Sequence, residues 1–173
     1  MSDLIIRKAT VEDVKYLALL TRITFREAFG YLFKDDQNLI DYFAKSFSIQ
    51  SLNVKLKDNN NVYWLAIADG VPIGYAKLIK NSPSKFIPDS KVSELQRIYV
   101  LNDFLNRKIG HHLQDAVFEE VKHIGSRHLW LSVYVDNPKA IRFYKRYDFQ
   151  HVGLHMFNIE RESFEFSVMD KVF

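Results

Sequence analysis

The middle of the chain carries the pattern that most restricts its fold, because strand and helix patterns alternate there. Leu95–Val100 is rich in strand formers, and Gly110–Ile124 places apolar residues on one face of a helix. Leu129–Val135 alternates as a strand does, and Pro138–Tyr147 begins with a proline, which suits the first turn of a helix. The sequence therefore predicts a strand–helix–strand unit followed by a second helix.

Further strands are expected on both sides of this unit. They are predicted at Leu4–Lys8, Val62–Ala68, Ile73–Ile79, Phe149–His155 and Phe164–Lys171. The dipeptide Asp69-Gly70 is typical of a hairpin turn. Thr10 is a candidate helix N-cap, and Leu39–Phe47 and Leu52–Leu56 favour two short helices. This order of elements predicts an α/β fold with a largely antiparallel sheet.

The composition excludes several classes of protein. The chain has 173 residues, which fits a single domain over residues 1–173. It contains no cysteine, which removes disulfides, thiolate metal sites and a cysteine nucleophile and fits a cytoplasmic protein. No apolar stretch approaches the roughly 20 residues that span a bilayer, so we expect no membrane partner. The net charge is only +3 and the basic residues are scattered, so we expect no nucleic-acid partner.

The six histidines do not predict a metal site. His111 and His112 are adjacent, so on a helix their side chains point roughly 100° apart, which does not suit one ion. His151 and His155 share a strand face but lie roughly 13 Å apart at the rise of a strand. We therefore expect no metal.

The loop that precedes Gly110 has the features of an anion site. A loop that turns directly into a helix presents unpaired backbone N–H groups and the positive end of the helix dipole. Arg107 and Lys108 add positive charge beside that helix start. Phosphate fits such a place, and an ordinary basic loop before a helix is the alternative interpretation.

The segment that follows favours the phosphate interpretation. Leu129–Val135 leads to Asn137 and Ala140 in an Asn-x-x-Ala pattern, and then to Phe143-Tyr144. This arrangement resembles the second half of the Gcn5-related N-acetyltransferase (GNAT) core, and the preceding strand–loop–helix resembles the family's pyrophosphate-binding half. The resemblance covers nearly the whole chain. It implies a GNAT fold, in which a mostly antiparallel mixed sheet of about six to seven strands is flanked by about four to five helices.

A closer likeness is to bacterial spermidine/spermine N-acetyltransferases of the PaiA type. It rests on Thr24–Gly30, on Arg97–Val100, and on Gly153–His155 with Phe157. This likeness implies transfer of an acetyl group from acetyl-CoA to a small primary amine, with a polyamine favoured, by direct transfer through a ternary complex.

The resemblance also implies where acetyl-CoA binds. The residues that it assigns to the cofactor are Ile98, Tyr99, Val100, Asn106, Arg107, Lys108, Ile109, Gly110, His111, Asn137 and Tyr144. The strand residues among them would offer main-chain groups to the pantetheine arm, and the loop from Asn106 to His111 would hold the pyrophosphate. Asn137 would contact the arm, and Tyr144 would lie near the sulfur.

Two positions of this loop depart from the family pattern. Leu105 stands where the pattern has Gln or Arg, and Lys108 stands where it has Gly. Loss of that glycine makes a close backbone approach harder if the position requires positive φ. We expect Lys108 to compensate with a direct charge contact.

Acyl transfer to an amine needs a neutral amine, a stabilised oxyanion and a proton for the leaving thiolate. We expect Tyr144 to donate that proton, and Glu94 to accept the ammonium proton directly or through water; a solvated carboxylate is the alternative interpretation of Glu94. The backbone N–H of Ile98 is the candidate oxyanion donor. The alternation of a strand predicts that Glu94 and Gln96 share one face with Ile98 and Val100.

The acceptor pocket is expected to involve the N-terminal helices, including Phe25, Phe29 and Tyr31. Asp35-Asp36 lies nearby in the sequence and could attract a polyamine, although a solvated loop is the favoured interpretation. Two other functions stay open: a non-catalytic acyl-CoA-binding regulatory module, and an acetyltransferase for a peptide or protein amine. A homodimer is a further possibility, through an edge strand near 164–168.

Overall fold

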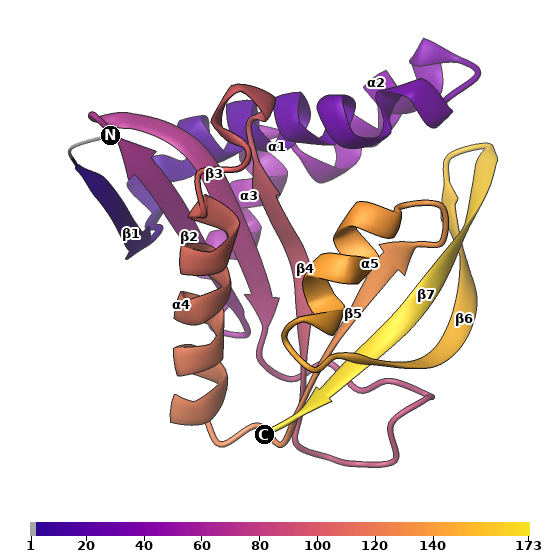
Figure 1. Ribbon diagram of the computed structural model, residues 1–173. Helices are drawn as coiled ribbons and strands as arrows, with labels where there is room; N and C mark the ends of the chain where they lie inside the picture. The colour runs from indigo at the N-terminus through magenta and orange to yellow at the C-terminus, as the bar shows by residue number, and fades with distance from the viewer. Residues whose placement is uncertain (1–2) are drawn as a thin grey trace.

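The structure, a computed structural model, describes residues 3–173, which form one mixed β-sheet with helices packed on it (Figure 1). The strands are β1 (Leu4–Lys8), β2 (Asn61–Ala68), β3 (Val71–Ile79), β4 (Val92–Val100), β5 (His128–Tyr134), β6 (Gln150–Ile159) and β7 (Glu162–Val172). The α-helices are α1 (Val14–Phe29), α2 (Asp36–Ser46), α3 (Ile49–Lys57), α4 (Ile109–His123) and α5 (Pro138–Lys145). None of the helices in this range is long and apolar enough to cross a membrane.

Neighbouring strands follow the order β1-β2-β3-β4-β5-β7-β6, and β4 with β5 is the one parallel pair within residues 3–173. The α4 helix makes the crossover between these two strands (Figure 1). The fold class predicted from the sequence is therefore confirmed. The predicted elements are present too, although β4 begins three residues earlier than Leu95 and Thr10 caps a short 3-10 turn that leads into α1.

Two apolar layers form because successive strand residues point to opposite faces of the sheet. In β2, Trp64 and Ala66 pack in the core under α4, whereas Tyr63 and Leu65 pack against α1 and α3. The α5 helix adds Ile141 to the α4 side. Both faces of the central strands are thus buried, and the sheet is fixed between two helical layers.

A β-bulge at Gln96 changes the side-chain pattern of β4. Lys77 of β3 pairs with Arg97, but the next residue of β3 pairs with Leu95, so Gln96 is the extra residue. Leu95 and Ile98, three residues apart, consequently pack in the same core under α4. The prediction that Glu94 and Gln96 share a face with Ile98 and Val100 is therefore wrong, because that prediction assumed unbroken alternation.

The edge strands of the sheet are β1 and β6, and not β7 as the sequence analysis assumed. The β7 strand lies between β5 and β6, and it pairs with both along most of its length. From Phe166 onward this segment is thus paired on both sides, and Phe164 and Glu165 pair with β6. The expectation that this segment is an edge that pairs between two chains is wrong.

Candidate active site

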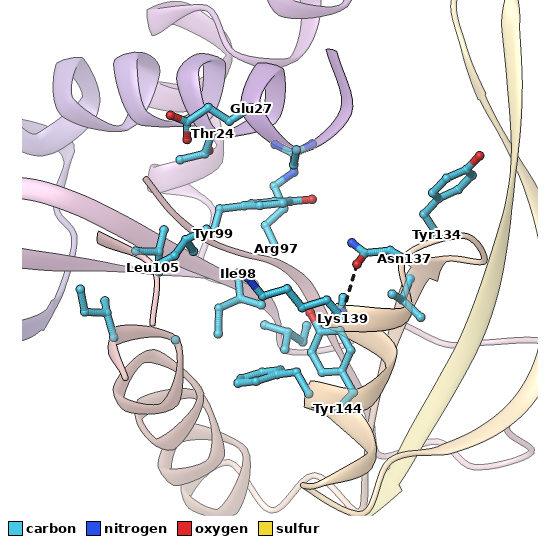
Figure 2. Close-up of a pocket in the computed structure, with 18 of the residues that line it drawn as sticks. Thr24, Glu27, Arg97, Ile98, Tyr99, Leu105, Tyr134, Asn137, Lys139 and Tyr144 are labelled. Atoms are coloured by element: carbon cyan, nitrogen blue, oxygen red, sulfur yellow. Dashed lines mark hydrogen bonds between the residues drawn. The ribbon is translucent and has the colours of Figure 1, made fainter. Parts of the chain in front are cut away.

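The sheet opens between β4 and β5, and this opening is the centre of the site. The two strands pair only from Val92 to Glu94, against His128 to Trp130, and then separate. Beyond that point their facing edges line a cavity of about 660 Å³, shown in Figure 2. Main-chain groups of β4 that face the opening have no strand partner there, so they are free to bind a ligand.

Most of the residues predicted to bind the cofactor line this cavity. They are Ile98, Tyr99, Val100, Asn106, Lys108, Ile109, Gly110, His111, Asn137 and Tyr144. Arg107 is the exception among the predicted set, because its guanidinium lies over the ring of Phe104, 5.2 Å from the ring centroid, and it does not line the cavity. The predicted residues thus form one wall of the cavity, and a contact of Arg107 with a cofactor stays a prediction.

The start of α4 presents backbone N–H groups to the cavity. Lys108 is the N-cap residue of α4, and it makes no capping hydrogen bond with its side chain. The first N–H groups of a helix lack intrahelical partners, and they carry the positive end of its dipole. Lys108 has a φ of 61° and Asn106 a φ of 64°, so both occupy the left-handed region. Lys108 therefore adopts the backbone conformation that a glycine would adopt more easily.

Three cations, two of α5 and one at its C-cap, line the opposite wall, and none of them was predicted as a site residue. Lys139, Arg142 and Arg146 all border the cavity, and Figure 2 shows the Lys139 side chain beside the opening. Their spacing of three and four residues places them on one side of a helix, a signal that the sequence did contain. Among the described residues that line this cavity, Glu27 is the one carboxylate, and its Oε2 accepts a hydrogen bond from the backbone N–H of Asn102 at 3.1 Å. The cavity is therefore strongly positive.

Two residues predicted from the sequence, at the start and near the end of α5, line the larger cavity. Asn137 is the N-cap of α5, and its Oδ1 accepts a hydrogen bond from the backbone N–H of Ala140 at 3.0 Å (Figure 2). Tyr144 is half-buried and packs against Phe149, with ring centroids 5.6 Å apart. Burial raises the pKa of Tyr144 above its ordinary value. Tyr144 therefore keeps its proton at neutral pH and can donate it.

A second cavity, of about 210 Å³, is lined by residues of α1, α2 and the strands β4 to β7. It shares six lining residues with the first, namely Phe29, Gln96, Arg97, Tyr99, Ser132 and Phe166. The two cavities therefore meet at the opening between β4 and β5. Such an arrangement can hold two ligands that react with each other across the opening.

Glu94 lines the second cavity and not the first. Its Oε2 accepts a hydrogen bond from the Ser82 hydroxyl at 2.8 Å, and burial raises the pKa of Glu94 above its ordinary value. The carbonyl of Ser82 accepts a hydrogen bond from Trp130 Nε1, also at 2.8 Å. The loop between β3 and β4 thus fixes both a carboxylate and an indole ring in the wall of this cavity.

A buried lysine, Lys77, and a half-buried arginine, Arg97, lie near Glu94, and neither was predicted as a site residue. Nη2 of Arg97 donates a hydrogen bond to the Tyr42 hydroxyl at 3.0 Å. The central carbon of the guanidinium lies over the ring of Phe47, 4.4 Å from the ring centroid. Lys77 donates a hydrogen bond to Gln96 Oε1 at 2.7 Å, and burial together with the charge of Arg97 lowers its pKa to about 7. These cations offset the charge of Glu94.

A histidine that the sequence reasoning set aside also faces the second cavity. Nε2 of His155 lies 2.9 Å from the hydroxyl of Ser132, which borders both cavities. Burial lowers the pKa of His155 below its ordinary value of 6.5, so the imidazole is neutral at neutral pH. It adds a further polar group to the lining of this cavity, in which most side chains are aromatic.

The N-terminal residues predicted for the acceptor pocket divide into two groups. Phe25 and Phe29 line the second cavity as expected. Tyr31 is 73% exposed and lines neither cavity. Asp35 caps the start of α2 by accepting the N–H of Gln37 at 2.9 Å, and Asp36 lies in the first turn of α2; neither borders a cavity. The prediction for Tyr31 is wrong, because the turn after α1 points this ring into solvent.

Comparison with known proteins supports the interpretation of the fold. Residues 22–149 match the acetyltransferase (GNAT) family. The chain is 24% identical, over 91% of its length and 90% of the other protein, to an uncharacterised N-acetyltransferase in the pepI 3' region of Lactobacillus delbrueckii subsp. lactis. Its fold is similar to the PaiA N-acetyltransferase of Thermoplasma acidophilum solved with coenzyme A, with a TM-score of 0.75, 19% identity and 99% of each chain covered.

A second solved structure has a similar fold. It is an N-acetyltransferase from Staphylococcus aureus Mu50, with a TM-score of 0.72, 20% identity and 99% of each chain covered. These structural likenesses establish the fold, and the family match covers most of the chain, including β4, α4, β5 and α5. The chain therefore belongs to the GNAT family of acetyltransferases.

Proposed function

We propose that this chain is an acetyl-CoA-dependent N-acetyltransferase that acts on a small primary amine by direct transfer in a ternary complex. The observation that carries the proposal is the pair of cavities that meet where β4 and β5 separate. The larger cavity is lined by several cations and borders the N-terminus of α4. The smaller cavity is lined mostly by aromatic residues. Their junction is where an acyl donor and an amine would react.

The larger cavity suits acetyl-CoA. The N–H groups at the start of α4, together with Lys108 and the α5 cations Lys139 and Arg142, would hold its phosphates. The open edge of β4 from Ile98 to Val100 would offer main-chain hydrogen bonds to the pantetheine arm. The resemblance of the sequence and the CoA in the similar Thermoplasma acidophilum structure support this cosubstrate.

The transfer needs no protein nucleophile. The amine nitrogen attacks the thioester carbonyl, a C–N bond forms, and the C–S bond breaks to release the thiolate. An ammonium loses two protons on its way to the amide, and one of these protons, or its equivalent, ends on the sulfur. The remaining proton goes to a base and then to solvent.

Three groups of the chain fit these steps. Tyr144 is protonated at neutral pH and lies in the cavity that would hold the thioester, so it would protonate the sulfur. Glu94 lies in the wall of the smaller cavity and would accept the ammonium proton, directly or through water. The backbone N–H of Ile98 would donate to the oxyanion, because β4 no longer pairs with β5 at this residue.

Polyamines are the acceptors that the resemblance to PaiA-type enzymes favours, so spermidine and spermine are the first compounds to test. A peptide or protein amine and a non-catalytic acyl-CoA-binding module are the alternatives. The cytoplasm stays the predicted compartment, and a homodimer stays untested.

The proposal is tested by following release of free thiol from acetyl-CoA with a panel of amines, while calorimetry measures CoA binding to the same preparation. Amine-dependent thiol release, with the acetylated amine detected by mass spectrometry, is the expected result. CoA binding without thiol release for any amine would contradict catalysis and would favour the regulatory module.

A further inference from the structure

We infer that the acceptor is an arylalkylamine, that is, a primary amine joined by a short spacer to one aromatic ring, and not a linear polycation. This inference rests on the proposed function, and it concerns the smaller cavity. Three features of that cavity carry it: its aromatic lining, its balance of charge and its size.

Aromatic rings dominate the lining of this cavity. Nine of the sixteen residues that line it within the described chain are Phe, Tyr or Trp. They come from α1, the turn after α1, α2, β4, β5, β6 and β7, and most of them pack on one another. The ring centroids of Phe33 and Phe164 lie 5.4 Å apart, and those of Phe157 and Phe166 lie 6.0 Å apart. Aromatic rings pair favourably in tilted and edge-to-face arrangements, so a ligand ring would find matching partners here.

The polar groups of the cavity fit one ammonium group. Among the described residues that line it, Glu94 is the one carboxylate. Arg97 also lines it, and no ion pair of Arg97 is found within residues 3–173. One carboxylate and one guanidinium leave no net negative field to attract a polycation.

A polyamine would place a second ammonium in this environment. Each of its amines is protonated at neutral pH, because an alkylamine has a pKa of roughly 10. The second ammonium would lose water beside Arg97 and gain no carboxylate, and contact with an aromatic face returns only part of that loss. A single ring, in contrast, buries apolar surface without any such penalty.

The size of the smaller cavity also favours a compact acceptor with one ring. Its volume of about 210 Å³ is below the roughly 300–1,000 Å³ of pockets that enclose drug-sized ligands. A compact acceptor with one ring fits this space, and the amine would then reach the opening near Ser132, which both cavities share.

The test compares 2-phenylethylamine, n-butylamine and spermidine as acceptors for the full chain, by thiol release from acetyl-CoA. We expect kcat/KM for 2-phenylethylamine to exceed that for each of the other amines by roughly tenfold or more, because the aliphatic amine lacks the ring and spermidine adds charge. A kcat/KM for spermidine equal to or above that for 2-phenylethylamine would overturn the inference and leave the proposed function intact. Release with none of these three amines, while another amine of the panel is acetylated, would overturn the inference alone, and release with no amine of the panel despite CoA binding would overturn both.

A variant separates recognition of the ring from a general structural effect. Phe157 is partly exposed and lies on the edge strand β6, so Phe157→Leu should fold. We expect this variant to lower kcat/KM for 2-phenylethylamine by about fivefold, with n-butylamine changed by less than about twofold. Phe173→Leu, which lies outside both cavities, is the matched control and should change neither. Equal losses for both amines in Phe157→Leu would contradict recognition of the ring.

Discussion

The two cavities differ in how the chain builds them. The larger cavity is formed mainly by one stretch of chain, from the end of β4 through α4 and β5 to α5, with a contribution from α1. The smaller cavity collects side chains from α1, α2 and four strands that lie far apart in the sequence. The first offers backbone groups and repeated positive charge, whereas the second offers the shapes of individual rings. The proposed cosubstrate side would therefore depend mainly on the fold, and the proposed acceptor side mainly on the side chains of this sequence.

The largest expected effect is at the predicted proton donor, which lines the larger cavity. We expect Tyr144→Phe to lower kcat by roughly 10²- to 10⁴-fold, because the leaving thiolate loses its proton donor, with the KM for acetyl-CoA changed by less than about threefold. Steady-state kinetics with a fixed amine measures both values. Tyr31→Phe, an exposed tyrosine outside both cavities, serves as the control. A kcat within about threefold of the native value would assign the proton to another group.

Removal of the carboxylate in the smaller cavity should have the next largest effect. We expect Glu94→Gln to lower kcat/KM by roughly 10- to 100-fold. As the pH falls, the Glu94 carboxylate gains a proton and can no longer act as a base, so the native kcat/KM should fall. Because the pKa of Glu94 is raised, this fall should occur at a higher pH than the pKa of an ordinary glutamate would give. This acidic limb should disappear in Glu94→Gln. If the limb persists unchanged in a pH series, Glu94 is not the base.

Removal of positive charge from α5 should weaken only the binding of acetyl-CoA in the larger cavity. We expect Lys139→Gln with Arg142→Gln to raise the KM for acetyl-CoA by roughly tenfold, equivalent to about 1.4 kcal/mol, with kcat changed by less than about threefold. The native KM should also rise with salt, and the double variant should show less of this dependence. Lys145→Gln on the same helix is the control, since Lys145 does not line the cavity. A loss of kcat without a change in KM would contradict a role in cosubstrate binding.

The smallest effect concerns the backbone at the start of α4. Lys108 holds a φ of 61°, which is unfavourable for a residue with a Cβ, so Lys108→Gly should stabilise the fold by about 0.5–1 kcal/mol. The same change at Lys122, within α4, should destabilise it by about 0.5–1 kcal/mol. Urea unfolding of both variants measures the difference. Destabilisation by Lys108→Gly would show that the lysine side chain contributes more than the backbone conformation costs.

The elements of the fold and one wall of the larger cavity could be predicted from the sequence, because each depends on local pattern. The strands follow from alternation, and the helix start at Lys108 follows from the loop before Gly110. Even the overlooked cations Lys139 and Arg142 belong to a helical spacing that the sequence displays.

The acceptor side could not be predicted in the same way. No glycine or proline in the sequence signals the bulge at Gln96. This bulge nevertheless places Glu94 in the lining of the smaller cavity together with Arg97. The aromatic lining depends on the hairpin of β6 and β7 reaching the turn between α1 and α2, as in the contact between Phe33 and Phe164. Such contacts are set by tertiary packing, and no spacing in one segment encodes them.

The initial-velocity pattern tests the central claim most directly, since the claim is that two cavities hold acyl donor and amine at the same time. Acetyl-CoA and an active amine are varied together, and double-reciprocal plots are drawn at several fixed amine concentrations. The account predicts lines that intersect, as expected for a ternary complex. Parallel lines, with an acetyl group found on the protein after incubation with acetyl-CoA alone, would indicate a covalent intermediate and would contradict direct transfer across the β4–β5 opening.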